Sequence, residues 1–443
     1  MATKRVTEQN CTLNCTLNYA LNCAKCGACA VVCPVFRVDG REVLTARGKM
    51  HLLTTALAEQ PSAVFEDRFS RCLLCGACEQ VCPRQLPITA LISQARSTFS
   101  RFYGPNGLTK AAACAALTHP ALFEGLVKAG ISLQRLQALP VQSGLRLKLD
   151  LLEQRTEPIE PSLSLNNNIV PQEGQPTACL SYFTGCLARH LQPSVAQATQ
   201  NLLQHSGLTT AHVPPDQCCC GLAAWSAGKQ ELACELARKN IQAFADADPL
   251  SVDAPIITSC ASCSSHLLAY PTLFAKDDPW HDRAVAFADR VQEFTSFFDD
   301  KLLAGFCTES CTAHSQHPDQ HPKTRVFYHD PCHLRFENKG MSTPRSLLHK
   351  AGVQLLEPKH GPRCCGQGGL FHLDCPEHSA QIFEKSSKQA LAGSSDYITT
   401  TCSGCLMQYQ EGLARQGQRV KVVHLASLLV ACLEIASRRD RRK

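Results

Sequence analysis

Two four-cysteine runs near the N-terminus have the residue type and spacing that bind iron. Both read Cys-x2-Cys-x2-Cys-x3-Cys-Pro, and they occupy residues 23–34 and 72–83. Four thiolates at this spacing, closed by a proline, hold a [4Fe–4S] cubane cluster. Such a cluster takes up and releases single electrons. The two runs therefore predict a redox protein with two cubane clusters.

The spacing also predicts which cysteines share a cluster. In a two-cluster ferredoxin the fourth cysteine of each run ligates the other cluster. We therefore assign the first cluster to Cys23, Cys26, Cys29 and Cys82, and the second cluster to Cys72, Cys75, Cys78 and Cys33. Zinc is the main alternative for paired cysteines, but it does not explain two runs that end in Cys-Pro. No Cys-x-x-Cys is followed by histidine, which excludes c-type haem.

A second cysteine pattern follows, and it is also present twice. Each copy has a single cysteine, then an adjacent pair followed by glycine, then Cys-x2-Cys. Corresponding cysteines of the two copies are 146, 145 and 142 residues apart, which indicates an internal repeat. The first copy consists of Cys186, Cys219, Cys220, Cys260 and Cys263, and the second of Cys332, Cys364, Cys365, Cys402 and Cys405. Gly221 and Gly366 follow the adjacent pairs, where a positive φ lets both thiolates face one site.

The elements around this repeat predict an α/β domain that occurs twice. Short apolar strands are expected at 178–182 and 325–328, before the first cysteine of each copy. Two more are expected at 255–258 and 397–400, before each Cys-x2-Cys, and helical patterns follow. This order is typical of α/β domains. It places the cysteines at strand ends, where open α/β sheets bind ligands.

We accordingly divide the chain into four parts and expect an α/β protein overall. Residues 154–177 are rich in Pro, Asn, Gln and Glu, as a linker is, and 308–323 form a second break. Helical spacing is found at 43–58 and in a final amphipathic segment at 422–436. The predicted parts are a dicluster ferredoxin domain at 1–103, a helical connector and linker at 104–176, and two cysteine-rich α/β domains at 177–306 and 324–436.

Composition is that of a globular protein in a reducing compartment. The chain has 443 residues, of which 44% are hydrophobic and 28 are cysteine. The x2 and x3 cysteine spacings suit metal ligation better than disulfides, and no signal peptide or spanning segment is visible. We predict a cytoplasmic protein. The net charge of +6 is modest, so we expect no nucleic-acid partner, and the basic tail at 438–443 is either solvated or a contact with the inner face of the cell membrane.

The order of these motifs resembles the iron–sulfur subunit of glycolate oxidase and of D-lactate dehydrogenase systems. The repeat resembles the CCG, or cysteine-rich, domain, which is also found in one of the subunits of heterodisulfide reductase and in one of those of anaerobic glycerol-3-phosphate dehydrogenase. The helical insert between the cubane runs resembles the dicluster ferredoxin of succinate dehydrogenase iron–sulfur subunits, and segment 47–53 strengthens the glycolate oxidase match. The resemblance covers nearly all of residues 15–435.

This resemblance implies an oxidoreductase subunit that relays electrons. In that family a partner flavoprotein carrying FAD oxidises a 2-hydroxy acid, and this subunit passes the electrons to quinone or another carrier. In the heterodisulfide reductase branch, five such cysteines hold a noncubane [4Fe–4S] cluster, so a further cluster is implied in one or both CCG domains. A metal-free domain or a zinc site is the alternative there, and Cys218 is an alternative to its neighbours as a ligand.

Other functions stay open at this point. A heterodisulfide-type thiol/disulfide reductase, an electron-transfer subunit of anaerobic glycerol-3-phosphate dehydrogenase and a scaffold with empty CCG domains share these motifs. No convincing flavin, nicotinamide or P-loop motif is present, so we assign this chain no catalytic residue for hydride transfer. His266 and His333 either donate to cluster sulfurs or pack in the core. The sequence does not choose among D-lactate, glycolate and glycerol 3-phosphate.

Overall fold

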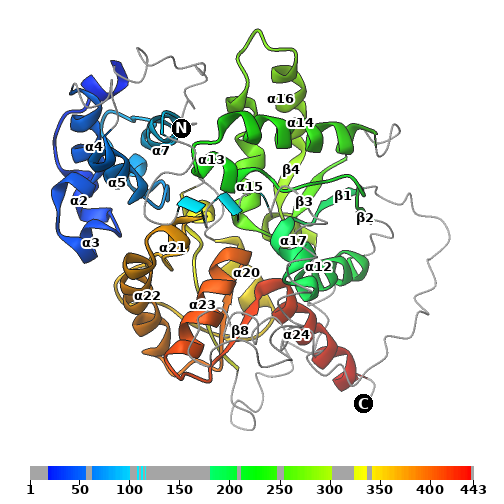
Figure 1. Cartoon of the computed structure of the whole chain (residues 1–443). Coiled ribbons are helices and arrows are strands. Elements are labelled where there is room, and N and C mark those ends of the chain that lie inside the picture. The colour runs from blue at the N-terminus through cyan, green and yellow to red at the C-terminus, as the bar shows by residue number, and fades with distance from the viewer. Residues whose placement is uncertain are drawn as a thin grey trace, which may run out of the picture.

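The computed structural model describes most of the regions that carry the motifs. The described residues are 18–55, 62–99, 107–108, 111–112, 115, 180–206, 211–246, 254–301, 324–336 and 342–440. Figure 1 shows three bodies around a common centre. We call residues 18–99 the N-terminal helical domain (blue), 180–301 the first α/β domain (green) and 324–440 the second α/β domain (yellow to red).

The N-terminal helical domain is built from short helices around an aromatic core. The rings of Phe65, Phe69 and Phe99 pack together in its centre, with the Phe65 and Phe69 centroids 4.3 Å apart. Side-chain caps begin two of its helices, because Thr45 accepts from the Gly48 amide and Ser62 from the Phe65 amide. Its helices are α2 (Ala28–Val32), α3 (Phe36–Asp39), the 3-10 turn η1 (Glu42–Leu44), α4 (Ala46–Leu53), α5 (Ala63–Ser70), α6 (Ala77–Gln80) and α7 (Ile88–Ser97).

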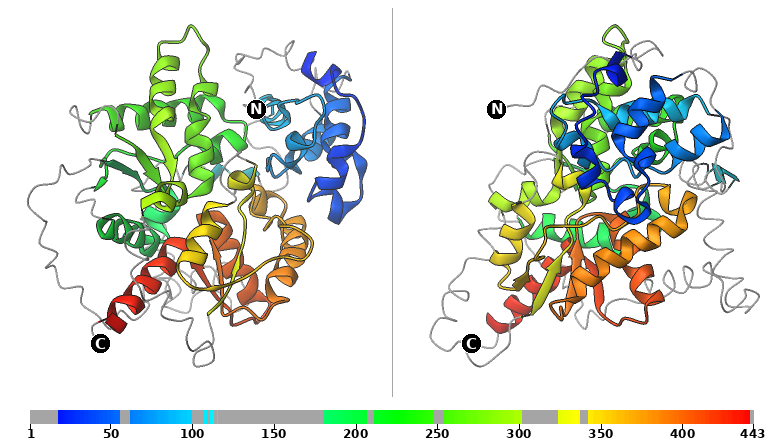
Figure 2. Two further views of the ribbon diagram at one scale, coloured as in Figure 1. Left: turned by 180° about the vertical axis from the view of Figure 1, so that it is seen from behind. Right: turned by 90° about the vertical axis from the view of Figure 1, so that its left-hand side faces the viewer.

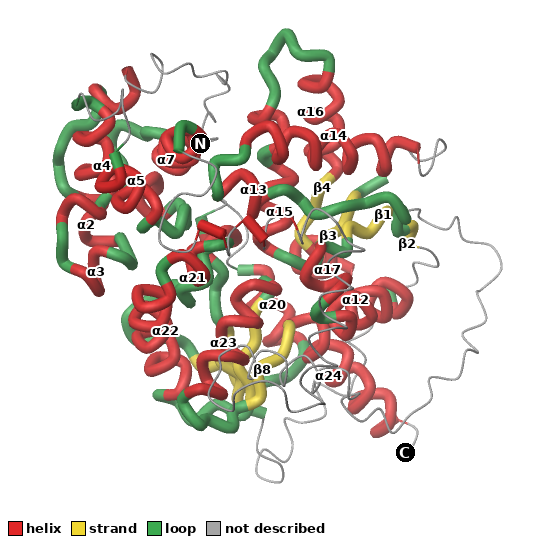
Figure 3. Tube along the Cα trace, in the orientation of Figure 1, coloured by secondary structure: helices red, strands yellow, loops and turns green. Residues whose placement is uncertain are grey.

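The first α/β domain contains a four-stranded sheet in the order β2-β1-β3-β4, in which every pair is parallel. Helices surround the sheet, as the colours of Figure 3 show. Its strands are β1 (Leu180–Phe183), β2 (Ala211–His212), β3 (Ile256–Thr258) and β4 (Val291–Glu293). Its helices are α11 (Cys186–His190), α12 (Pro193–His205), α13 (Leu222–Ser226), α14 (Gln230–Asp246), α15 (Ala261–Leu268), η3 (Tyr270–Leu273), α16 (Trp280–Arg290) and α17 (Phe294–Lys301).

The second α/β domain repeats this topology. Its sheet has the order β6-β5-β7-β8, again parallel throughout, so each strand corresponds to one in the first domain. Its strands are β5 (Arg325–Tyr328), β6 (Gln354–Leu356), β7 (Tyr397–Thr400) and β8 (Lys421–His424). Its helices are α19 (Cys332–Arg335), α20 (Thr343–Lys350), α21 (Phe371–Asp374), α22 (Pro376–Leu391), α23 (Ser403–Arg415) and α24 (Leu425–Asp440).

The two α/β domains share a core. Helix α24 packs against α12, and one apolar cluster contains buried residues of both domains, among them Leu202, Phe298 and Leu429. Both views of Figure 2 show α24 (red) beside the first domain. The N-terminal helical domain contacts both: the Ser93 hydroxyl donates to the Trp225 carbonyl at 2.6 Å, and α3 packs on α22. These contacts bring motifs that are far apart in sequence to the centre of the molecule.

The α/β class and the repeat predicted from the sequence are confirmed, and the strands expected at 325–328 and 397–400 have those bounds. One expectation is wrong in detail. The segment 422–436 does not begin as a helix, because Lys421–His424 form β8 at the edge of the sheet and α24 starts at Leu425. The helical connector and linker at 104–176 lie almost entirely outside the described residues, and the break at 308–323 lies outside them altogether. The four domain boundaries stay predictions.

Candidate metal centres

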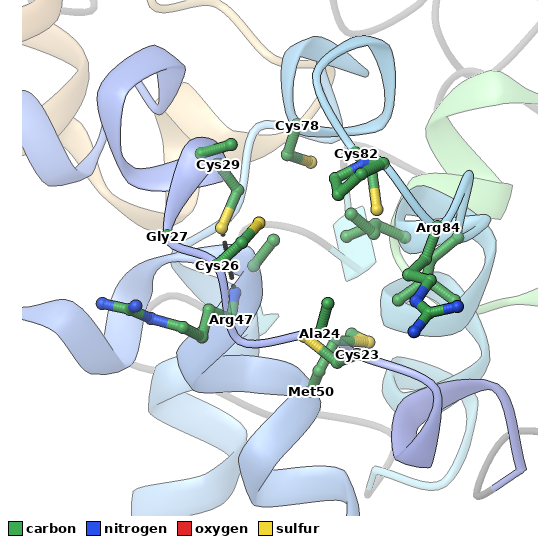
Figure 4. A pocket seen from close by; sticks show the side chains of 15 residues that line it. Cys23, Ala24, Cys26, Gly27, Cys29, Arg47, Met50, Cys78, Cys82 and Arg84 are labelled. Atoms are coloured by element: carbon green, nitrogen blue, oxygen red, sulfur yellow. Dashed lines mark hydrogen bonds between the residues drawn. The ribbon is translucent and has the colours of Figure 1, made fainter.

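The first predicted ligand set surrounds one cavity in the N-terminal helical domain. Cys23, Cys26, Cys29 and Cys82 line this cavity together with Cys78. Figure 4 shows these side chains around a common space, with Arg47 and Arg84 on opposite sides of it. The Arg47 amide donates to the Cys29 sulfur at 3.3 Å. Cys23, Cys26 and Cys29 come from the first cysteine run, which leads into α2. Cys82 comes from the second run, as expected if the fourth cysteine of each run ligates the other cluster.

The second predicted set lines a neighbouring cavity. Its members Cys33, Cys72, Cys75 and Cys78 lie around this cavity, and Cys78 borders both cavities. Burial raises the pKa of the Cys75 and Cys78 thiols, since a thiolate loses its hydration there. The Leu74 amide donates to the Cys72 sulfur at 3.5 Å. The four cysteines of each predicted set thus line one cavity, with Cys78 bordering both cavities, and the assignment of ligands to clusters stays a prediction.

The third set gathers where strands of the first α/β domain end. Cys186 begins α11 after β1, Cys260 caps α15 after β3, and Cys219 and Cys220 precede α13. A hydrogen bond from Cys186 lowers the pKa of the Cys219 thiol and raises that of Cys186 itself. Cys263 completes the set from within α15. All five predicted residues therefore lie together.

The fourth set repeats this arrangement in the second α/β domain. Here a hydrogen bond joins the thiols of Cys332 and Cys364. It lowers the pKa of the Cys364 thiol, which belongs to the first cysteine of the adjacent pair, and raises that of Cys332. The sulfurs of Cys365 and Cys405 are 3.3 Å apart. His329 adds a ring nitrogen, and its atom and those two sulfurs lie within 4.8 Å of one another. The cysteine pattern alone does not predict that this histidine lies beside the thiols.

The glycines after the adjacent cysteines adopt the backbone that the sequence predicted. Gly221 has φ +94° and Gly366 has φ +89°, in the left-handed region. A Cβ on Gly366 would also lie 2.6 Å from the Ser379 carbonyl oxygen. At Gly366 both the positive φ and this close approach therefore favour a residue without a side chain, whereas at Gly221 the positive φ does so alone.

Cys218 does not point into the third set. Its sulfur contacts the carbonyls of Cys219 and Leu236 at 3.7 and 3.6 Å, and it packs with residues of α13 and α14. Burial raises the pKa of its thiol to about 12. The register in which Cys219 and Cys220 are the paired cysteines is thus the one that the fold favours.

The third and fourth sets meet at the boundary between the α/β domains. Cys260 of the first domain is hydrogen-bonded to Cys402 of the second. The Ser262 hydroxyl lies 3.1 Å from the Cys402 sulfur and 2.8 Å from Nδ1 of His333. The Ala261 amide donates across the boundary to the Thr401 carbonyl at 2.8 Å. His333 is therefore hydrogen-bonded to Ser262, which itself lies beside the Cys402 sulfur. This contact differs both from donation to a cluster sulfur and from simple packing in the core, the two roles considered for this histidine.

The second and fourth sets also meet. Cys33 and Cys75 pack against the same apolar cluster that contains Leu73, Cys364 and Phe371. The charge of Cys364 is the main electrostatic influence on the Cys75 thiol after burial. The four sets consequently form a continuous series: the first beside the second, the second beside the fourth, and the fourth beside the third.

The donor sets fit iron–sulfur clusters. Among the described residues all cysteines are free thiols, and those of the third and fourth sets are largely buried side by side. Neighbouring buried thiols cannot all ionise unless positive charge compensates them, and metal ions supply that charge. Nε2 of His266 is buried without a hydrogen-bond partner among the described residues, and it faces the backbone of the third set at Gly221. An acceptor sulfur of a bound group would satisfy it.

Comparisons with known proteins place these centres in a family. The 4Fe-4S dicluster domain profile matches residues 19–86, and the cysteine-rich domain profile matches 180–268 and 326–410. The probable glycolate oxidase iron-sulfur subunit of Bacillus subtilis is 29% identical over 92% of this chain and 93% of that protein. Lactate utilization protein A of Shouchella clausii is 31% identical over 56% of this chain and 98% of that protein, and that of Exiguobacterium is 30% identical over 56% and 96%.

The chain belongs to the same family of iron–sulfur proteins as lactate utilization protein A, and it contains a 4Fe-4S dicluster domain and two cysteine-rich domains. It is an electron-transfer subunit of an oxidoreductase, with iron–sulfur clusters as its redox groups. The described residues include no helix of the length and hydrophobicity that a bilayer crossing requires.

Proposed function

We propose that this chain relays electrons from an FAD-containing 2-hydroxy-acid dehydrogenase to quinone or another carrier. Glycolate and D-lactate are the substrates that we propose for the partner. The names of the similar proteins, a glycolate oxidase subunit and lactate utilization proteins, support this choice. Hydride transfer belongs to the partner, and this chain carries the electrons at the cytoplasmic side of the membrane.

The continuity of the four cysteine sets is the observation that supports the relay. The first two sets share the border at Cys78, the second joins the fourth at Cys75 and Cys364, and the fourth joins the third at Cys402 and Cys260. A [4Fe–4S] cluster in a set supplies one-electron transfer. We propose that the first and second sets hold cubanes and that the third and fourth sets each hold a noncubane cluster.

The chain's own residues would position and insulate these groups. The apolar cluster around Cys219, Cys260, Cys365 and Cys402 keeps water from the junction of the α/β domains. Amides that donate to sulfur, such as Gly366 to Cys364 at 3.4 Å, stabilise negative charge on a ligand. Burial and hydrogen bonding of this kind set the reduction potential of a cluster.

A ligand replacement in the middle of the series tests the relay. In the Cys75→Ser complex we expect substrate to reduce the partner's flavin normally, whereas quinone reduction falls to the background of the flavoprotein alone. The matched control is Cys234→Ser, because Cys234 lies outside all four sets and donates to the Leu273 carbonyl. Stopped-flow absorbance of the flavin and steady-state quinone reduction measure the two steps. Normal quinone reduction by the Cys75→Ser complex would contradict the proposal.

A further inference from the structure

Lys49 is a buried cation at the wall of the second cavity. Its side chain is 1% exposed, although α4 otherwise presents polar residues such as His51 to solvent. The ammonium donates to the Leu44 carbonyl and to the Arg71 carbonyl, the latter at 3.4 Å. Both residues line the cavity together with Lys49. The helix thus places Lys49 at the wall of the cavity that the thiols of the second set line.

No carboxylate pairs with this lysine among the described residues. Removing an ammonium from water without a counter-charge is costly, so lysines are rarely buried this completely. Burial lowers the pKa of Lys49, and the groups that oppose this by favouring its charged form are Cys72, Cys33 and Cys78, all of the second set. Reciprocally, burial raises the pKa of the Cys33 thiol, and the charge of Lys49 opposes that rise. Lys49 and Cys33 therefore act on each other through their charges, and Cys72 and Cys78 also favour the charged form of the lysine.

A second buried cation supports the same set. Arg96 of α7 is 6% exposed and donates to the carbonyls of Phe69, Ser70 and Cys72. It also donates to the Ser226 carbonyl across the domain boundary. These hydrogen bonds hold the loop that carries Cys72. Their acceptors are backbone carbonyl oxygens, not carboxylates. Two buried positive charges thus lie near one cysteine set.

The first cavity has no equivalent among the described residues. Its basic neighbours are Arg84, which is exposed, and Arg47, which pairs with Glu42 at 2.7 Å. Exposed and paired charges are screened by water and salt, whereas a buried charge acts through a medium of low dielectric constant. The two cavities therefore differ in their electrostatics even though their cysteine motifs are the same.

We propose that Lys49 is a positioning residue that raises the reduction potential of the second cluster above that of the first. Reduction adds one electron and one negative charge to the cluster, and no bond forms or breaks. A fixed cation at the cavity wall stabilises that extra charge. Electrons that reach the cubane pair would then collect at the second cluster, next to the fourth set. The inference rests on the proposed function, because it requires clusters in the first two sets.

Redox titration of the anaerobically purified full chain, followed by paramagnetic resonance, tests the proposal. In Lys49→Met we expect the higher of the two cubane potentials to fall by at least the equivalent of a tenfold change in the one-electron equilibrium, about 59 mV. Lys49→Arg keeps the positive charge, so the higher potential should fall by much less than in Lys49→Met. Lys239→Met, which removes an exposed lysine of α14, should leave both potentials unchanged. Iron content and stability to heat are measured in parallel.

A variant that keeps Lys49 provides a second test if Lys49→Met does not assemble. Cys26→Ala alters the first set only, so it should remove or perturb the signal with the lower potential. Perturbation of the higher-potential signal would overturn the inference, as would unchanged potentials in an iron-replete Lys49→Met chain. Absence of [4Fe–4S] signals from the wild-type chain would instead contradict the proposed function itself.

Discussion

At the residue scale, each centre depends on which sulfur points inward. The chain offers three consecutive cysteines at 218–220, and their types alone do not say which two belong to the site. Gly221 at positive φ sets the turn after Cys220, and Cys218 is directed toward α14 instead. A buried thiol of this kind behaves as a small hydrophobic side chain. Adjacent cysteines of the same chemical type therefore have different roles.

Replacement of these two neighbours separates the roles. We expect Cys219→Ala to lose about four irons per chain, which is the content of one [4Fe–4S] cluster. Cys218→Ala should keep its full iron, because the Cys218 sulfur contacts only carbonyls and apolar side chains. Iron and protein quantitation after anaerobic purification measures both. Equal loss of iron in the two variants would show that the register of the third set is wrong.

Prediction from the sequence succeeds where ligands are local and fails where contacts are distant. Cysteine spacing predicts residues that the structure brings together, although the ligand assignment itself stays a prediction, and the positive φ of Gly366 was expected from the need to direct two adjacent thiols to one site. The meeting of Cys75 with Cys364 depends on how two domains pack, which no local pattern encodes. Lys49 was also missed, because a lysine in an amphipathic segment is expected to be solvated.

At the element scale, short strands and the turns that follow them position the cysteines of the α/β domains. Strands β1 and β5 lead to Cys186 and Cys332, and helices α15 and α23 begin directly after Cys260 and Cys402. The same parallel order in both sheets explains why the two sets have the same geometry. The β8 strand was not predicted, because the apolar run that follows Lys421 suits a strand and a buried helix equally.

A glycine substitution tests the dependence on the turn. Gly366→Ala places a methyl group 2.6 Å from the Ser379 carbonyl oxygen, whereas Gly361, with φ +71°, has open space around its Cβ position. The left-handed backbone costs about 1–2 kcal/mol in each alanine variant, and the overlap adds about 1–3 kcal/mol for Gly366→Ala only. We expect Gly366→Ala to be the less stable variant and to lose iron from the fourth set.

Thermal denaturation followed by circular dichroism and iron quantitation distinguish these two variants. Gly361→Ala serves as the control for backbone strain alone. Equal stability and equal iron content of the two variants would contradict the claim that close approach to Ser379 requires glycine at position 366.

At the scale of the whole molecule, the proposed electron path runs through all three domains. The N-terminal helical domain joins the second α/β domain through α3 and α22, where Asp39 bonds to Nε2 of His378 at 2.7 Å. It joins the first through Ser93 and Trp225. Each α/β domain supplies all five cysteines of its own set, and the two sets are buried in one apolar cluster where the domains meet. In the proposed relay, the repeat therefore adds two further cysteine sets in series with the two sets of the N-terminal helical domain.

The most direct test of the relay uses the complex from its native host. The chain is purified anaerobically with its co-purifying proteins, and D-lactate or glycolate is added without any other reductant. If the chain is the proposed relay, a flavoprotein partner co-purifies, and substrate bleaches the iron–sulfur absorbance of this chain after reduction of the flavin. Absence of a flavoprotein, with clusters that stay oxidised under both substrates while the isolated chain reduces disulfides, would contradict it.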